Sequence, residues 1–96
     1  MIRIIDGQST GKTGRLMLLA KEHNALFVCD NPDAMRVKAE AYGITGIQFV
    51  SYYDYLKSNY DTNKENVVID ELETLLKYML DGHLIGYTLS DNDWLN

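Results

Sequence analysis

The sequence is poor in the residues that mark secreted proteins and metal sites. It contains one cysteine, Cys29, so no internal disulfide can form, and neither His23 nor His83 has cysteine or acidic neighbours at metal-ligand spacing. Its apolar runs are too short to span a bilayer, and no N-terminal signal segment is visible. We therefore expect a cytoplasmic protein in which Cys29, set in an apolar run, is a buried thiol.

Positive charge is also scarce. The chain has 9 Lys and Arg against 14 Asp and Glu, for a formal net charge of −5. Non-specific nucleic-acid binding depends on neutralising phosphates with Lys and Arg, so this balance argues against it and leaves room only for a local basic patch. With 96 residues, 46% of them hydrophobic, the chain has the composition of one small globular domain spanning residues 1–96.

Strand-like and helix-like patterns alternate along the chain. This order predicts a three-layer α/β domain with a five-stranded, mostly parallel sheet. The expected strands are Ile2–Ile5, Ala25–Cys29, Ile47 to Ser51 or Tyr52, Asn66–Ile69 and His83–Leu89. The expected helices are Lys12–His23, a segment from the start signal Asp30-Asn31-Pro32-Asp33 to Tyr42, a short turn at Asp54–Lys57, and a helix with Leu72, Leu75, Leu76, Met79 and Leu80 on one face.

A glycine-bounded loop joins the first expected strand to the first expected helix. Its residues are Gly7, Gln8, Ser9, Thr10, Gly11, Lys12 and Thr13. A phosphate-binding loop needs this order, because backbone N–H groups, a lysine and the start of a helix must all face the anion. Asp6 stands where the usual pattern has its first glycine, so the motif is a variant. The alternative is an ordinary glycine-rich turn capped by Ser9 or Thr10.

A second motif, Val67-Val68-Ile69-Asp70-Glu71, is an apolar strand ending in two acids. Asp70 at the strand tip could hold Mg²⁺ near Thr13, and Glu71 could orient and deprotonate an attacking water. The alternative is that both acids only favour the start of the next helix. The carboxyl ends of parallel strands share one edge of the sheet, so we expect the two motifs to meet there.

Together these motifs resemble the Walker A and Walker B motifs of the P-loop NTPases. The order of elements is similar to the first RecA-like domain of superfamily-two helicases and to small phage ATPases. Two further segments carry this likeness: the Pro-containing turn after the second strand and the Tyr-rich turn after the third. The resemblance implies an ATP and Mg²⁺ site in which Lys12 and Thr13 bind phosphate and metal, Asp70 binds metal and Glu71 acts on the water. It also implies that Thr88 or Ser90 senses the γ-phosphate.

The sequence departs from the family pattern in ways that change the functional prediction. We expect no second RecA-like domain, and Arg3, Arg15 and Arg36 do not stand where an arginine finger in cis is expected. We therefore predict a nucleoside triphosphate–Mg²⁺ binding protein of phage or mobile-element type, a slow or partner-dependent ATPase whose site a protein partner or a second copy completes. The alternatives are a protein-interaction module with a vestigial nucleotide site and, as a lesser one, an accessory factor in nucleic-acid remodelling.

The aromatic residues have two interpretations. The tyrosines near the third strand, at positions 52, 53, 55 and 60, either stack on a base or partner or pack around the strand. Trp94 is expected to anchor the polar tail, with an interface as the alternative.

Overall fold

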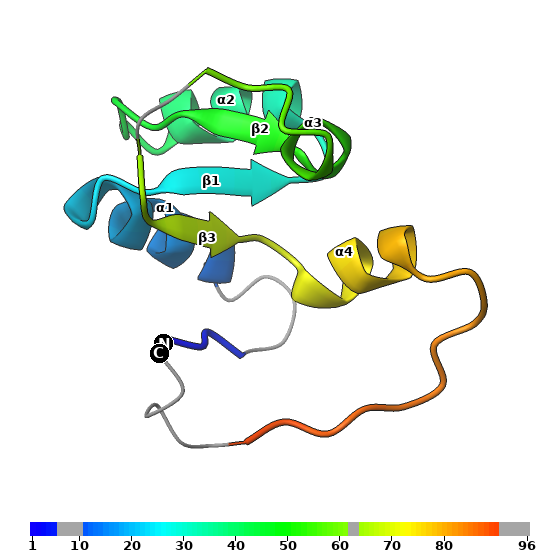
Figure 1. Cartoon of the computed structure of the whole chain (residues 1–96). Helices are drawn as coiled ribbons and strands as arrows, with labels where there is room; N and C mark the ends of the chain where they lie inside the picture. Colours follow the sequence, from blue (N-terminus) through cyan, green and yellow to red (C-terminus); the bar gives the residue numbers. More distant parts are fainter. Residues whose placement is uncertain (6–10, 62–63, 91–96) are drawn as a thin grey trace.

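The computed structural model describes residues 1–5, 11–61 and 64–90, and its described part is a small α/β unit (Figure 1). The elements in chain order are α1 (Lys12–Glu22), β1 (Leu26–Cys29), α2 (Pro32–Ala41), β2 (Phe49–Ser51), α3 (Tyr52–Leu56), β3 (Val67–Ile69) and α4 (Leu72–Met79). Within the described residues the sheet has three parallel strands in the order β2-β1-β3.

The central strand β1 is buried along its whole length, as its continuous apolar sequence predicts. It pairs with both neighbours, so that Phe27 lies opposite Phe49 on β2 and opposite Val68 on β3. The rings of Phe27 and Phe49 meet edge to face, with their centroids 5.0 Å apart. β1 is therefore the strand on which both halves of the core are built.

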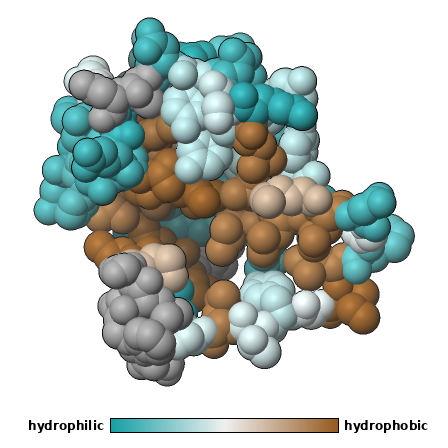
Figure 2. All heavy atoms as spheres, in the orientation of Figure 1, coloured by the Kyte–Doolittle hydropathy of each residue, from teal (hydrophilic) through white to brown (hydrophobic). Residues whose placement is uncertain are grey.

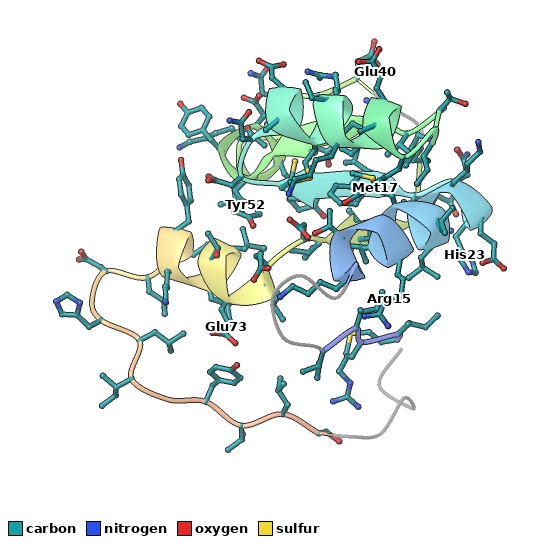
Figure 3. The ribbon with its side chains drawn as sticks, turned by 180° about the vertical axis from the view of Figure 1, so that it is seen from behind. Arg15, Met17, His23, Glu40, Tyr52 and Glu73 are labelled. Atoms are coloured by element: carbon teal, nitrogen blue, oxygen red, sulfur yellow. The ribbon has the colours of Figure 1, made fainter. Side chains whose placement is uncertain are left out.

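Helices cover both faces of the sheet. Phe27 and Cys29 belong to a buried cluster with Met17 of α1 and Ala39 of α2, and Figure 3 shows Met17 between α1 and the sheet. Leu26, Val28 and Val50 belong to a second buried cluster with Tyr52 of α3 and Leu75 of α4. The two clusters follow from the alternation of side chains along β1, which sends successive residues to opposite faces.

The prediction of a five-stranded sheet was wrong. The segments Ile2–Ile5 and His83–Leu89 form no strand. Ile2 and Ile5 are 62% and 74% exposed, and Ile85 is 98% exposed, so these side chains do not pack on the sheet. An outer strand is stabilised mainly by packing of its side chains, and Gly86 further weakens the second segment as a strand.

The helices agree more closely with the sequence, although their ends shift. Asn31 caps α2 by accepting a hydrogen bond from the Ala34 N–H at 3.2 Å, and Pro32 is the first helical residue. α3 begins at Tyr52, earlier than predicted, because the Ser51 side chain caps it by accepting from the Asp54 N–H at 3.0 Å. Among the described helices, none combines the length and apolar character needed to cross a bilayer.

Candidate functional site

The first helix, α1, begins at the carboxyl edge of the sheet and has no capping side chain at its N-cap residue, Gly11. Gly11 precedes Lys12 and has φ 76° and ψ 18°, a left-handed conformation that glycine adopts without strain. Gly11 has no side chain that could cap the first N–H groups of α1, so an anion bound there could accept hydrogen bonds from them. Asp6, Gly7, Gln8, Ser9 and Thr10 lie outside the described residues, so their part in a phosphate loop remains a prediction.

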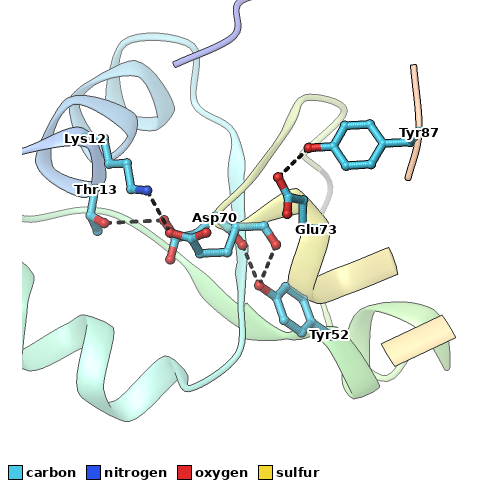
Figure 4. Close-up of polar contacts among 7 residues, drawn as sticks. Lys12, Thr13, Tyr52, Asp70, Glu73 and Tyr87 are labelled. Carbon is cyan, nitrogen blue, oxygen red and sulfur yellow. Dashed lines mark hydrogen bonds and ion pairs between the residues drawn. The ribbon is translucent and has the colours of Figure 1, made fainter. Parts of the chain in front are cut away.

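The two motifs meet in space, as the sequence predicted. The Thr13 hydroxyl donates to a carboxylate oxygen of Asp70 across 3.4 Å, although the two residues are 57 positions apart (Figure 4). Next to this contact, the Lys12 ammonium forms an ion pair with Glu71, with 3.2 Å between Nζ and Oε1. The start of α1 and the end of β3 are thus joined by two parallel side-chain contacts.

Asp70 is the buried member of this group. Its side chain is only slightly exposed, at 9% for the whole residue, and its backbone N–H donates to the Val28 carbonyl at 2.9 Å. Burial raises the pKa of the Asp70 carboxyl, and the nearby charge of Glu71 raises it further, whereas the hydrogen bond from Thr13 lowers it. A neighbouring cation stabilises the ionised form of a buried carboxylate, so Asp70 is suited to bind a metal ion.

Tyr52 holds the backbone that carries the two acids. Its side chain is 2% exposed, and its hydroxyl donates to the backbone carbonyl of Asp70 and, at 3.3 Å, to that of Glu71 (Figure 4). Glu71 has φ 57°, a left-handed conformation that is costly for a residue with a Cβ. Burial, followed by the charge of Asp70, raises the pKa of Tyr52, so its hydroxyl stays a donor. The sequence indicated Tyr52 only as a packing or stacking residue, because nothing local predicts a bond to carbonyls 18 and 19 positions away.

The oxygen atoms of Thr13 and Asp70 fit a magnesium site of the nucleotide type. In the described parts of the chain, no three His, Cys, Asp or Glu side chains are grouped as a metal centre of their own. Mg²⁺ in nucleotide sites uses only one or two protein oxygens and takes its other ligands from phosphates and water. Adjacent ligands of an octahedral Mg²⁺ lie about 3 Å apart when each is about 2.1 Å from the ion, so the observed 3.4 Å requires little adjustment.

The predicted sensor residues, Thr88 and Ser90, are exposed and lie in the irregular segment that follows α4. Their sensor role remains a prediction, but the strand that was expected to carry them to the phosphates does not form. The same segment contacts the fold through Tyr87, whose hydroxyl donates to Glu73 (Figure 4). That hydrogen bond raises the pKa of Tyr87.

Cys29 is a buried free thiol, as predicted. It donates to the Val50 carbonyl at 3.7 Å, and burial, followed by the charge of Asp70, raises its pKa to about 12. The thiol is therefore protonated at neutral pH, and Cys29 serves packing rather than chemistry.

No family model, curated protein or solved structure matches this chain. The likeness to P-loop NTPases therefore rests on the two motifs and on the contacts that join Lys12 to Glu71 and Thr13 to Asp70. A functional conclusion has to be argued from that geometry.

Proposed function

We propose that the chain binds a nucleoside triphosphate with Mg²⁺, with ATP as the reference ligand, and hydrolyses it slowly or only with a partner. The observation that carries this proposal is the meeting of Lys12 and Thr13 with Glu71 and Asp70 at the carboxyl end of β3. A cation and a hydroxyl at a helix start, facing two acids at a strand end, are the groups that a metal-bound polyphosphate needs.

The phosphates would take the place that the Glu71 carboxylate now occupies beside Lys12. The side chains of Lys12 and Glu71 are 28% and 49% exposed, so their ion pair lies in a solvated environment and contributes at most about 1 kcal/mol. A polyphosphate carries more charge than one carboxylate, and the N-terminus of α1 adds to its attraction. Exchange of partners at Lys12 is therefore favourable.

The metal would be held by Thr13 and Asp70, and Mg²⁺ would supply charge neutralisation at the phosphate oxygens. Release from Lys12 leaves the Glu71 carboxylate free to accept a proton from water. The Glu71 backbone is in a left-handed conformation, and its carbonyl accepts a hydrogen bond from the Tyr52 hydroxyl. The position of the Glu71 backbone is therefore set before the ligand binds. We expect an arginine from a protein partner or a second copy to complete the site, and the chain alone to hydrolyse the nucleotide slowly.

Calorimetric titration with ATP and Mg²⁺ tests the phosphate site. We expect saturable binding by the native chain and its loss, by at least tenfold in affinity, in Lys12→Ala. Lys21→Ala is the matched control, because Lys21 is an exposed lysine in the last turn of the same helix. Absence of heat at millimolar nucleotide, or equal affinity in Lys12→Ala and Lys21→Ala, contradicts the proposal.

A protein-interaction module is the second candidate, and the exposed apolar surface favours it. Figure 2 shows hydrophobic surface running across the middle of the face in view. Exposed apolar side chains include Leu72, Met79, Leu80, Ile85 and Leu89. A module with a vestigial site would keep its melting temperature when ATP and Mg²⁺ are added, whereas a nucleotide-binding protein would melt higher with both than with Mg²⁺ alone. A cytoplasmic location is part of either proposal and is supported by the single free thiol.

A further inference from the structure

A cavity lies between α3 and α4, separate from the Lys12–Glu71 contact. It has a volume of about 400 Å³, is open to solvent, and is lined by Tyr53, Leu56, Lys57 and Tyr78. The two tyrosine residues are each about half exposed, at 53% and 52%. The Lys57 ammonium lies 5.8 Å from the centroid of the Tyr53 ring. The volume is within the range of small-molecule sites, which begins at about 300 Å³.

The cavity lies between two helices that begin at the same edge of the sheet as the two acids. α3 follows β2 directly and α4 begins just after β3, so both helices start where parallel strands end. Tyr78 is seven positions after Glu71, which corresponds to roughly 10 Å along the axis of α4. An extended nucleoside triphosphate is long enough to cover that separation.

Tyr52 connects the cavity to the acids. Its ring lies 6.4 Å from that of Tyr78, centroid to centroid, and Figure 3 shows it projecting toward α4. Its hydroxyl bonds to the carbonyls of Asp70 and Glu71. The wall of the cavity and the backbone of the acids are therefore parts of one packed unit.

We propose that this cavity is the base-binding subsite of the nucleotide site, with the base stacking on Tyr53 and Tyr78. The inference rests on the proposed function, and it goes further by assigning the base to residues that no phosphate motif contains. Phenol rings present large flat faces at low entropic cost, and stacking on them tolerates any base. The subsite should therefore favour purines over pyrimidines through contact area, with little discrimination between adenine and guanine.

A comparison of two ligands distinguishes binding at the base subsite from binding at the phosphate site. The dissociation constants of Mg²⁺–ATP and Mg²⁺–tripolyphosphate are measured by calorimetry on the native chain and on Tyr53→Ala, Tyr78→Ala and the control Tyr60→Ala. Tyr60 is a suitable control because it is exposed and stacks on Tyr55, with centroids 5.5 Å apart. Circular dichroism checks that each variant is folded, and Tyr53→Ala keeps the test valid if Tyr78→Ala unfolds.

We expect the native chain to bind ATP more tightly than tripolyphosphate. Each cavity variant should weaken ATP binding about tenfold and leave tripolyphosphate binding unchanged, while Tyr60→Ala changes neither. Equal affinity of the native chain for the two ligands overturns the subsite but leaves the phosphate site standing, and so does full ATP affinity in the two cavity variants. Failure of the native chain to bind either ligand refutes the phosphate site, and the subsite with it.

Discussion

Replacing Tyr52 with phenylalanine removes one oxygen atom from the centre of the structure. The ring, 2% exposed, stays in its cluster with Val28 and Leu75, so the apolar packing is unchanged. What is lost is the hydrogen bond to the Asp70 carbonyl and the longer one, at 3.3 Å, to the Glu71 carbonyl. A hydrogen bond contributes about 1 kcal/mol net, and a buried carbonyl left without a donor adds to the loss.

We therefore expect Tyr52→Phe to lower the free energy of unfolding by about 1–2 kcal/mol. For a domain of 96 residues this lowers the melting temperature by roughly 5–15 °C. Urea denaturation followed by circular dichroism gives the free energy, and a thermal scan gives the melting temperature. Tyr53→Phe is the matched control: the neighbouring residue is 53% exposed, so its hydroxyl is solvated and its loss should change stability by less than about 0.5 kcal/mol.

Tyr52→Phe also tests whether the Tyr52 hydroxyl positions the nucleotide site or only stabilises the fold. If Tyr52 positions the turn at Asp70 and Glu71, then Tyr52→Phe should weaken binding of ATP with Mg²⁺ at temperatures where the variant is fully folded. Equal stability of the Tyr52→Phe and Tyr53→Phe variants would refute the reasoning from the buried hydroxyl. Loss of stability with unchanged affinity would confine the role of Tyr52 to folding.

Three other changes test the acids and the helix start. Burial raises the folded-state pKa of Asp70 above its ordinary value of 3.8, so the native state loses stability as pH rises from below 3.8 through the raised pKa. Asp70→Asn should therefore be more stable than the native chain at pH 7 and should lose this advantage near pH 3 in acid denaturation curves. The same variant should lose the Mg²⁺-dependent binding of nucleotide. Glu71→Gln should bind ATP up to about fivefold more tightly in calorimetry, because the substitution removes the carboxylate that competes for Lys12. The variant should no longer release phosphate from ATP, and an unchanged rate of hydrolysis would show that Glu71 does not act on the attacking water. Gly11→Ala should cost about 1 kcal/mol in urea denaturation, because its φ of 76° is strained for alanine although no atom lies within 4 Å of the added methyl, while Gly82→Ala, which also meets no atom, should cost less.

The inner elements could be predicted from the sequence, and the outer ones could not. Leu26–Cys29 is a continuous apolar run that has to be buried on both faces, and Asn31 and Pro32 mark the start of α2 through local hydrogen bonding and a fixed φ. Ile2–Ile5 is also rich in isoleucine, yet Ile2 and Ile5 stay exposed and the segment forms no strand. A short apolar run becomes a strand only if a neighbouring strand and a covering helix accept it, and neither can be read from the run itself.

The candidate site divides in the same way. Lys12, Thr13, Asp70 and Glu71 could be named from two short motifs, because their residue types and their places after a loop and a strand carry the chemistry. Tyr52 could not be named, because its role depends on the distance from α3 to a turn 18 residues later in the chain. The cavity at Tyr53 and Tyr78 likewise comes from two helices that follow different strands.

By itself, the sequence determined what is local: the buried central strand, the helix starts and the chemical groups available for a phosphate and a metal. The tertiary structure alone decided the number of strands among the described residues, the ion pair of Lys12 with Glu71, and the support that Tyr52 provides. The physical reason is that capping, periodicity and backbone strain act between near neighbours, whereas burial and hydrogen bonding across the core depend on which distant segments share the limited interior of a small domain.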